Sequence, residues 1–323
     1  MYDIITVGSA TVDVFVKTST KNVKIINVPE HDVCYPIGSK ILIDNLHFDT
    51  GGGGTNATTA FSRLGFKTGW VGKLGNDANS ATILETIRKE GIDFLGSQGE
   101  GLAGYSVILV GVGNDRTILT FKGINDQLSV SDFDWNALNT KWLYFSSMMS
   151  QSWKTLEKIA KFARKNGVNY AFNPSMYLAQ QGLRSLRKVI DGAAVLILNK
   201  EESQALVGKN VDKEVLKLLQ EYARIVVVTD GANGAQAFDG EKFYSILPNR
   251  IKVVETTGAG DAFAAGVVAG LMQGQKLDKS LQIGLAESES VIQHIGAKNI
   301  LLSHAELEKS LSKRAGKVSV GVL

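Results

Sequence analysis

The segment with the clearest chemical character is a glycine-rich turn that ends in an aspartate. Residues Thr257-Gly258-Ala259-Gly260-Asp261 follow a β-branched run at 251–254, predicted to be a strand, and precede an alanine-rich stretch, 262–272, predicted to be a helix. A helix N-terminus presents unpaired N–H groups and a positive dipole end, and glycines let a ligand approach the backbone closely. The turn therefore suits an anion such as a phosphoryl group, with Asp261 placed to take a proton from an attacking hydroxyl. The alternative is a plain turn in which Asp261 caps the helix.

A second glycine-rich turn, Gly51-Gly52-Gly53-Gly54-Thr55-Asn56, opens a helix predicted over 56–64. Four consecutive glycines cost backbone entropy, which is understandable where the backbone must lie against a ligand. The Asn56 amide would then be available to bind a hydroxyl group. The alternative is a flexible loop with an asparagine cap.

Polar residues also follow several of the predicted strands. Asp13 comes shortly after the first strand, in the zone where an open α/β sheet binds ligands. Asn199 and Glu202 follow a strand and carry the hard oxygen atoms that suit Mg²⁺ and its waters, although a capped helix start would use the same residues. The turn from Thr229 through Gly231 to Gly234 suits close packing against a nucleotide, but glycine turns after strands are common.

The elements that position these residues alternate between short apolar runs and helical patterns. The apolar runs predict buried strands at 4–7, 67–71, 142–145, 169–172, 194–198 and 225–229. The helical patterns between them cover 56–64, 81–89, 153–165, 211–222 and 262–272. This alternation predicts a single α/β domain over residues 1–323, with a mostly parallel sheet covered by helices on both faces.

Two stretches, at about 14–48 and 105–121, interrupt the alternation. They contain predicted strands at 14–16, 40–43, 106–110 and 116–121 with no helix between them, and the turn 112–115 predicts a hairpin. We interpret both stretches as a small β-rich flap inserted into the α/β domain.

Composition narrows the class of protein further. Of the 323 residues, 44% are hydrophobic, and the net charge of +3 is too small for a nucleic-acid-binding protein. The single cysteine, Cys34, excludes an intrachain disulfide and a cysteine zinc site, and the four histidines lack ligand spacing. The N-terminus has the pattern of a buried strand and not of a signal peptide, and no apolar run approaches the roughly 20 residues that span a bilayer. We therefore expect a cytoplasmic protein with neither a membrane nor a nucleic acid as its partner.

Taken together, the motifs resemble those of the ribokinase-like, pfkB-type family of carbohydrate kinases. The resemblance runs from residue 3 to about residue 300, with several spaced motifs in the family order. The first signature is matched by Gly51–Asn56, Thr58, Gly65 and Gly75, and the second by Thr256, Gly258, Ala259, Gly260, Asp261, Ala265 and Gly266. The family's NxxE element is matched by Asn199 and Glu202, and its nucleotide-side turn by Thr229, Gly231 and Gly234.

The resemblance implies a three-layer α/β sandwich with a β-rich lid, in an enzyme that moves the γ-phosphoryl group of ATP to a hydroxyl of a sugar or nucleoside. It implies that Asp261 is the general base and that Gly258, Ala259 and Gly260 form the anion hole. It further implies that the acceptor is bound by Asp13, Gly51, Gly52 and Asn56, and the nucleotide by Asn199, Thr229, Gly231 and Gly234. Glu202 would hold Mg²⁺ through water. The lid would close over the acceptor to exclude water and, as in some members, would pair two subunits into a homodimer.

Two positions depart from the family pattern. Glu255 stands where the family usually has Asp, near a monovalent-cation site in many members, which leaves potassium dependence open. Thr11 stands where ribokinases proper have Asn, which weakens an assignment to ribose.

The acceptor and the activity both leave alternatives. The sequence Asn173-Pro174-Ser175, with Tyr105 and Phe121 in the lid, resembles archaeal nucleoside kinases, whereas Arg116 and Lys122 suit a phosphosugar or are ordinary solvated residues. A catalytically silent regulator would not need Asp261, Asn199 and Glu202. A dinucleotide-dependent oxidoreductase is disfavoured because no GxGxxG follows the first strand.

Overall fold

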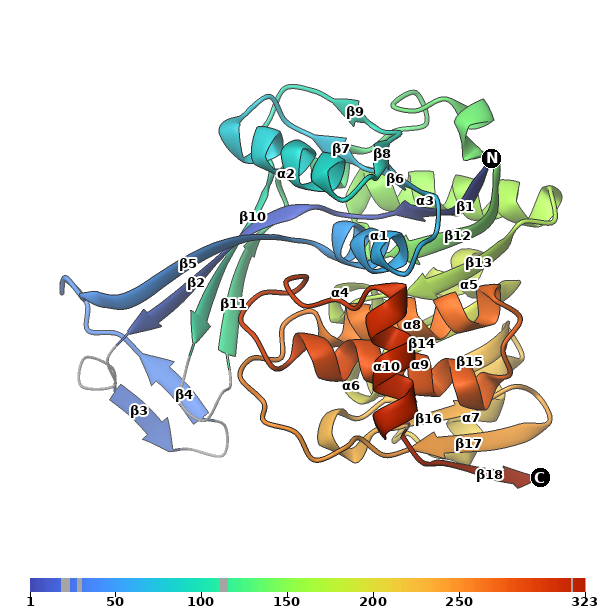
Figure 1. Cartoon of the computed structure of the whole chain (residues 1–323). Helices are drawn as coiled ribbons and strands as arrows, with labels where there is room; N and C mark the ends of the chain where they lie inside the picture. The colour runs from blue at the N-terminus through green and yellow to red at the C-terminus, as the bar shows by residue number, and fades with distance from the viewer. Residues whose placement is uncertain (19–23, 28–30, 111–115, 315, 323) are drawn as a thin grey trace.

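A ten-stranded sheet forms the centre of the molecule (Figure 1). The computed structural model describes residues 1–18, 24–27, 31–110, 116–314 and 316–322. The strand order is β18-β17-β16-β15-β14-β13-β12-β1-β6-β8; pairing is parallel from β15 to β8 and antiparallel among β15, β16, β17 and β18. The bounds are β1 Tyr2–Val7, β6 Thr68–Val71, β8 Asp93–Phe94, β12 Thr140–Ser146, β13 Asn169–Asn173, β14 Ala193–Asn199, β15 Ala223–Thr229, β16 Ala235–Phe238, β17 Lys242–Ile246 and β18 Val318–Val322. The six predicted buried strands are all present in the parallel part.

Helices cover both faces of this sheet, which gives the predicted three layers. One face carries α1 (Gly53–Arg63), α8 (Ala259–Met272), α9 (Leu277–Val291) and α10 (His304–Arg314). The other carries α3 (Ser150–Lys165), α4 (Met176–Ala179), α5 (Gly182–Ile190), α6 (Lys200–Val207) and α7 (Lys213–Gln220). The remaining elements are α2 (Ala78–Lys89), the two-residue strands β7 (Lys73–Leu74) and β9 (Ser97–Gln98), and the 3-10 turns at Gly123–Gln127, Trp135–Leu138 and Gly231–Asn233. All five predicted helices are therefore confirmed.

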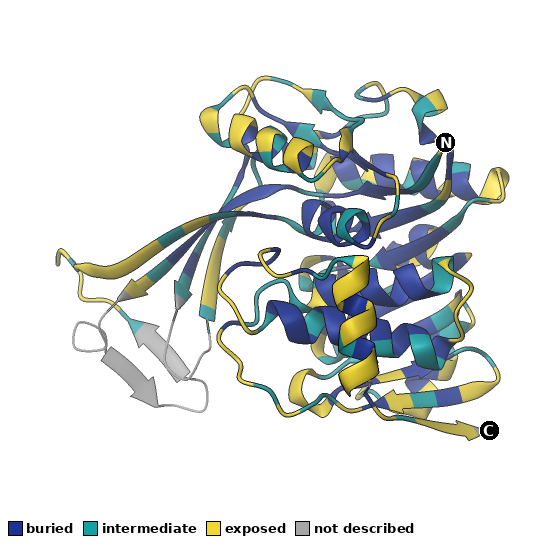
Figure 2. Ribbon diagram, in the orientation of Figure 1, coloured by how far each residue is buried: buried dark blue, intermediate teal, exposed yellow. Residues whose placement is uncertain are grey.

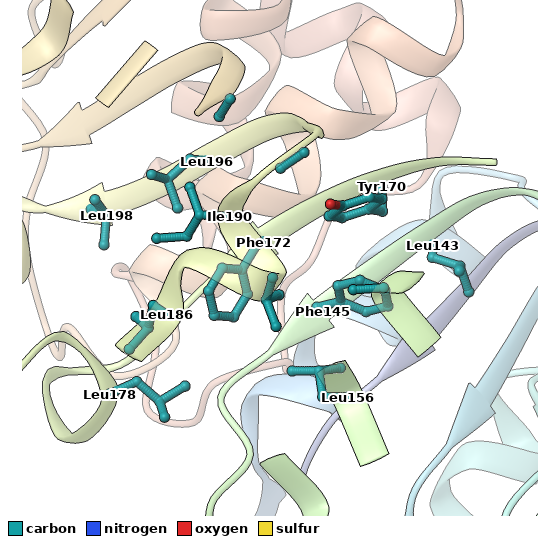
Figure 3. Close-up of a cluster of buried hydrophobic side chains, with 14 of the residues drawn as sticks. Leu143, Phe145, Leu156, Tyr170, Phe172, Leu178, Leu186, Ile190, Leu196 and Leu198 are labelled. Carbon is teal, nitrogen blue, oxygen red and sulfur yellow. The ribbon is translucent and has the colours of Figure 1, made fainter. Parts of the chain in front are cut away.

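The continuous apolar runs are explained by burial of both sheet faces. In β14, Leu196 and Leu198 pack into the core beside α3 and α5, whereas Val195 and Ile197 pack into the core beneath α8 and α9. Figure 3 shows the first of these cores, and Figure 2 shows buried helix faces turned toward the sheet. Each fully buried aliphatic side chain contributes about 1.5–3 kcal/mol. Among the helices of the described residues, none has the length and apolar character needed to cross a membrane.

A separate four-stranded sheet, the small sheet, extends to one side of the large one (Figure 1). Its order is β11 (Arg116–Phe121), β10 (Gly104–Val110), β2 (Thr11–Thr18) and β5 (Ile43–Gly51). A pair of strands, β3 (Lys24–Asn27) and β4 (His31–Cys34), lies beyond its far end, so that Cys34 ends β4. The predicted hairpin turn 112–115 falls outside the described residues.

Two predicted strands are wrong. The strand predicted at 40–43 begins only at Ile43 and continues to Gly51, because it is the residues from 43 onward that pair with β2. Residues 251–254 form no strand despite their β-branched composition. Val254 instead donates its N–H to the Ile292 carbonyl at 2.8 Å, so the segment is held by the end of α9 and not by a sheet.

The strand registers divide the small sheet into two faces. Asp13 pairs with Ser106, and Ser106 with Thr120, so these residues share one face with Ile118 and Arg116. The opposite face carries the apolar residues Val12, Val14, Leu46, Phe48, Leu119 and Phe121. The base of that opposite face packs on α2, where Val12 and Val14 are buried with Ile83 and Ile87.

Candidate active site

A cleft of about 380 Å³ opens where the parallel strands end. Its floor includes one polar residue from the carboxyl end of each of five strands: Ser9 after β1, Ser146 in β12, Asn173 in β13, Asn199 in β14 and Thr229 in β15. Its side is the polar face of the small sheet, with Asp13, Ser106, Arg116, Ile118 and Thr120. The carboxyl end of an open α/β sheet is the place where ligands bind in this class of fold.

Both glycine-rich turns meet in this cleft. Gly258 is the N-cap of α8, with a φ of 80° that favours glycine, and Asp261 lies in the first helical turn without capping it. The Asn56 Nδ2 amide, in the first turn of α1, donates a hydrogen bond to Asp261 Oδ2 at 2.8 Å. The alternative interpretation of both residues as helix caps is therefore wrong. The N-caps are Gly52 and Gly258, and the side chains of Asn56 and Asp261 bond to each other.

The surroundings of Asp261 shift its proton affinity. Burial is the largest influence and raises the pKa of this carboxyl above its usual range, and the nearby Asp13 raises it further. The hydrogen bond from Asn56 and the charge of Lys298 act in the opposite direction. A carboxylate with a raised pKa, facing a cleft, has the character of a general base.

The backbone amides of the α8 turn are not equivalent. The Ala259 N–H donates to the Thr256 carbonyl at 3.2 Å, which closes the turn. Gly260 lies where a Cβ would meet nothing within 4 Å, and Gly258 lies directly against Ala297. Gly258, Gly260 and Asp261 line the cleft.

The four-glycine turn is shaped mainly by contact with the chain itself. A Cβ at Gly51 would lie 1.8 Å from Asp13 Oδ2, so only glycine leaves room for that carboxylate. Gly52 and Gly53 line the cleft. Asp13 is only 5% exposed and accepts a hydrogen bond from Thr11 Oγ1 at 2.7 Å. Burial raises the pKa of Asp13, while the hydrogen bonds from Thr11 and Ser106 oppose that rise.

Asn199 and Glu202 form a capping box at the start of α6, as the structural alternative predicts. Asn199 Oδ1 accepts the Glu202 N–H at 2.7 Å, and Glu202 Oε2 accepts the Asn199 N–H at 2.9 Å. Both residues also line the cleft, and burial raises the pKa of Glu202 to about 7. Within the described ranges no three His, Cys, Asp or Glu residues gather as a metal cage. The donor set fits Mg²⁺ only through a single carboxylate and water.

Only part of the turn from Thr229 to Gly234, predicted to contact the nucleotide, lines the cleft. Thr229 lines the cleft, whereas Gly231 and Gly234 are outside the lining and form the tight turn between β15 and β16. Gly231 and Gly234 have φ values of 48° and 87°. The shape of the turn itself therefore explains both glycines.

One contact between the small sheet and the α8 turn is not predicted by any sequence motif. Arg116, at the start of β11, donates a hydrogen bond to Thr256 Oγ1, and its Nε lies 3.5 Å from Glu255 Oε1. Glu255 is 5% exposed, and its Oε1 accepts the Thr257 N–H at 2.7 Å. The small sheet is thus tied to the residues directly before the α8 turn.

The aromatic residues of the small sheet do not reach the cleft. Tyr105 and Phe121 pair with each other across β10 and β11, on the face opposite Ser106 and Thr120. Tyr105 packs against the core at α2, and Phe121 is exposed. Tyr105 and Phe121 therefore do not line the cleft, whereas Asn173, Pro174 and Ser175 do.

Comparison with known proteins gives one consistent relationship. A family model described as pfkB family carbohydrate kinase matches residues 6–304. The chain is 26% identical to a ribokinase of Bacillus subtilis over 317 residues, which is 97% of this chain and 100% of the relative. It is 27% identical to an uncharacterized sugar kinase of Archaeoglobus fulgidus over 240 residues, covering 73% of this chain and 96% of the relative.

Solved structures share the fold at low identity. An adenosine kinase from Sinorhizobium meliloti superposes with a TM-score of 0.82 at 21% identity, covering 95% of this chain and 98% of that one. A ribokinase from Thermotoga maritima superposes with a TM-score of 0.78 at 20% identity, covering 97% and 100%. The large and small sheets thus form the ribokinase-like fold.

Proposed function

Because the chain belongs to the pfkB family of carbohydrate kinases, we propose that it transfers the γ-phosphoryl group of ATP to a hydroxyl of a sugar or nucleoside bound between Asp13 and Asp261. At the coarser level it is a phosphotransferase of the sugar and nucleoside kinase class. The observation that carries the proposal is the hydrogen bond between Asn56 and Asp261 inside a cleft at the strand ends.

Asp261 is the proposed general base. Asn56 occupies Oδ2, which leaves Oδ1 to accept the proton of the acceptor hydroxyl as its oxygen attacks the γ-phosphorus. Asp13, Gly51, Gly52 and Asn56 are proposed to bind and orient the other hydroxyls of the acceptor. Such positioning keeps the reacting oxygen in line with the phosphoryl group.

The first turn of α8 is the proposed anion hole. Since the Ala259 amide already donates to Thr256, the amides of Gly258 and Gly260 are the better candidates to bind the phosphoryl oxygens. The dipole of a 14-residue helix reinforces them. Charge that develops on the phosphoryl oxygens is stabilised by such fixed donors.

The nucleotide is proposed to bind at the far end of the cleft, along Asn199 and Thr229, and to extend past the lining onto the turn of Gly231 and Gly234. Mg²⁺ would neutralise charge on the phosphates, and Glu202 would hold it through water. Arg116 already places a guanidinium beside Glu255, so we expect equal rates in potassium and sodium salts of equal ionic strength.

A phosphorylated or acidic sugar is a second candidate acceptor, and Lys122 favours it. Lys122 lines the cleft at the base of the small sheet, with its Nζ 4.8 Å from the centre of the Tyr177 ring. Burial lowers the pKa of Lys122, a cost that an anionic acceptor would offset.

The experiment that tests the proposal is a screen for ADP release from MgATP over pentoses, hexoses, phosphosugars, 2-keto-3-deoxy acids and nucleosides. A positive result is ADP release that depends on one acceptor and is absent in Asp261→Asn. The proposal fails if no acceptor stimulates ADP release, or if the variant is as active as the wild type.

The lid function and the homodimer belong to the same proposal. The face of the small sheet away from the cleft exposes Leu46, Phe48, Leu119 and Phe121, and Phe48 is 60% exposed. A second copy that covers this apolar face would remove it from water. Light scattering should then give a dimer mass for the wild type and a monomer mass for Phe48→Lys; a monomeric wild type would contradict the dimer.

A further inference from the structure

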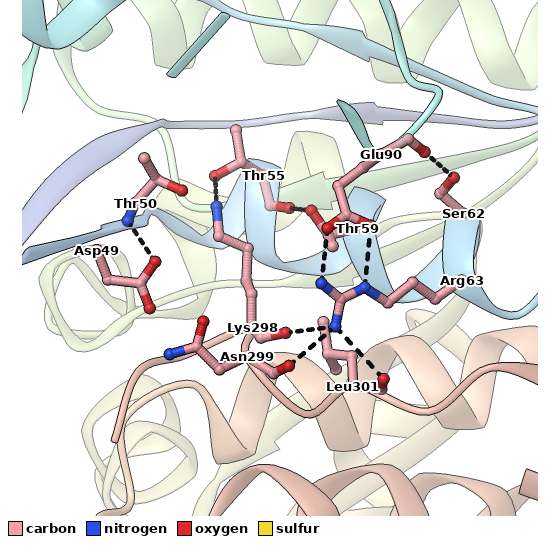
Figure 4. Close-up of polar contacts among 10 residues, drawn as sticks. All are labelled: Asp49, Thr50, Thr55, Thr59, Ser62, Arg63, Glu90, Lys298, Asn299 and Leu301. Carbon is pink, nitrogen blue, oxygen red and sulfur yellow. Dashed lines mark hydrogen bonds and ion pairs between the residues drawn. The ribbon is translucent and has the colours of Figure 1, made fainter. Parts of the chain in front are cut away.

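The segment that follows α9, residues 296–301, contacts both glycine-rich turns of the cleft. A Cβ at Gly258 would lie 2.6 Å from the Ala297 Cβ, so Ala297 lies directly against the α8 turn. The next residue, Lys298, extends its side chain to α1, where Nζ donates to Thr55 Oγ1 at 3.2 Å (Figure 4). One short segment therefore supports both ends of the site.

Arg63 fixes this segment in place. Its guanidinium donates to the carbonyls of Lys298 at 2.8 Å and Asn299 at 3.2 Å, as Figure 4 shows. The same guanidinium forms two hydrogen bonds with Glu90, of 2.6 and 2.9 Å. The backbone of Lys298 is therefore held by Arg63 at the end of α1, which is itself paired with Glu90 at the end of α2.

Lys298 is an unusual residue because it is only 4% exposed. Burial of an ammonium group costs several kcal/mol unless opposite charges compensate it. The charged groups around it are Asp49 of β5, Asp13 of β2, Asp261 of α8 and Glu90, with Arg63 as the cation. Asp49 lies against Gly296, where a Cβ would be 2.2 Å from Oδ2. Acidic neighbours therefore outnumber the basic one.

A chain of hydrogen bonds connects Lys298 to the acceptor end. Lys298 donates to Thr55 Oγ1, and Thr55 Oγ1 donates to the Gly51 carbonyl at 2.6 Å. Gly51 is the glycine against which the Asp13 carboxylate lies, and Gly53 lies 3.4 Å from Asp261 Oδ1, measured from its ideal Cβ position. Lys298 thus supports, from beneath, the turn on which both carboxylates rest.

We propose that Lys298 is the buried counter-cation of the site, a positioning residue that keeps Asp13 and Asp261 ionised and fixes the four-glycine turn through Thr55. The contribution of Lys298 to catalysis rests on the proposed function, but its electrostatic effect on the two carboxylates does not. Two carboxylates that share a site raise each other's pKa, and a nearby cation reverses that effect. Without Lys298 a larger fraction of Asp261 would be protonated and unable to accept a proton.

The proton affinities of these groups agree with this arrangement. Burial lowers the pKa of Lys298 to about 8, and Asp49 and Asp13 hold it from falling further. Lys298 lowers the pKa of both Asp13 and Asp261. The cation is therefore present at neutral pH and is lost as the pH rises through about 8.

Carbon-13 NMR of the ligand-free, full-length chain tests the proposal. The chain is labelled at aspartate Cγ and lysine Cε, and the resonances are assigned by their loss in Asp13→Asn, Asp261→Asn and Lys298→Met. In Lys298→Met we expect the titration midpoint of Asp13 or Asp261 to rise by about one pH unit, equivalent to about 1.4 kcal/mol. Lys298→Arg should restore the midpoint, and Lys309→Met, at an exposed position of α10, should leave it unchanged.

Unchanged aspartate midpoints in a folded Lys298→Met variant would overturn the proposal, as would a wild-type Lys298 that is already deprotonated at neutral pH. Should Lys298→Met fail to fold, the titration curves of the wild type alone test the proposal. Its Asp13 or Asp261 carbon must show a second inflection at the pH where Lys298 titrates, and its absence would overturn the proposal. Neither readout needs ATP or an acceptor, so failure of the kinase screen is distinguishable from failure here.

Discussion

The side-chain amide of Asn56 donates a 2.8 Å hydrogen bond to Oδ2 of Asp261, across 205 positions of sequence. Each residue lies in the first turn of a helix, α1 or α8, so two helix N-termini converge on one carboxylate. Both dipoles then favour negative charge at the same place, which is what a phosphoryl acceptor site requires.

Replacement of the proposed base tests the mechanism most directly. Asp261→Asn should lower kcat by about 10²-fold or more, the usual effect of a lost general base, because an amide cannot take the proton. The affinity for MgATP, measured by calorimetry, should stay within a few-fold of the wild type. A variant with near-wild-type turnover would contradict the assignment.

The Asn56–Asp261 bond predicts a change in pH dependence. The bond lowers the pKa of Asp261, so Asn56→Ala should raise it. Activity depends on the ionised form and is lost as the pH falls through that pKa, so the acidic limb of the kcat profile should move to higher pH by about one unit. Asn166→Ala, which removes an exposed asparagine of the α3 terminus, is the control and should not move the limb.

The proposed role of Glu202 in binding Mg²⁺ can be tested separately from its role in the capping box of α6. Glu202→Gln keeps an oxygen that can accept the Asn199 N–H but removes the charge, so the fold should be retained. The Mg²⁺ concentration for half-maximal activity should rise about tenfold or more, the effect of losing an outer-shell partner. Glu201→Gln alters an exposed carboxylate of the same turn and should leave the requirement unchanged; equal behaviour of the two variants would remove Glu202 from the metal site.

Arg116 should couple the small sheet to phosphoryl transfer. Arg116→Met removes its charge-assisted contacts with Thr256 and Glu255, so closure would exclude water less well. We expect kcat/KM for the acceptor to fall about tenfold, which corresponds to about 1.4 kcal/mol, and the fraction of ATP hydrolysed without transfer to rise. Thr117→Val, at the next position on the opposite face of β11, is the matched control. A normal transfer-to-hydrolysis ratio in Arg116→Met would count against the coupling.

The two glycines of the α8 turn should respond differently to alanine. Gly258→Ala forces a side chain into a φ of 80° and into Ala297, so the free energy of unfolding should fall by about 2–4 kcal/mol. Gly260→Ala adds a methyl group that meets nothing, and its unfolding free energy should stay within about 1 kcal/mol of the wild type. Chemical denaturation measures the unfolding free energy of both variants. Equal destabilisation would show that the close contact between Gly258 and Ala297 does not determine the cost of the substitution.

Much of the large sheet is predictable because its information is local. A run such as 194–198 contains only apolar residues, mostly branched, and burial of both faces of β14 follows from that alone. The glycine-rich turns are likewise recognisable, since few other residues tolerate their backbone shapes. Strand propensity was misleading at 251–254, where no strand forms and the Val254 N–H donates to the Ile292 carbonyl at the end of α9 instead.

The electrostatic parts of the site depend on contacts that no local pattern contains. Lys298 sits in the sequence Gly296-Ala297-Lys298-Asn299, which resembles any exposed polar turn, and only the fold places it beneath Thr55. Arg116 begins an edge strand of mostly exposed residues, and only the fold brings it to Glu255, in the loop that precedes α8. Asn199 and Glu202 are the opposite case, because their motif is visible in the local sequence. The same two residues form a capping box and line the cleft.

The position of Cys34 at the end of β4 gives the molecule a built-in reporter. It is the single cysteine of the chain, it lies beyond the small sheet, and all four tryptophans (Trp70, Trp135, Trp142 and Trp153) belong to the large body. A thiol-linked energy acceptor at Cys34 would therefore be sensitised by donors in the large sheet and the elements that pack on it. Movement of the β3–β4 pair relative to the large sheet can thus be followed by resonance energy transfer in the unmodified sequence, with no cysteine to remove and none to add.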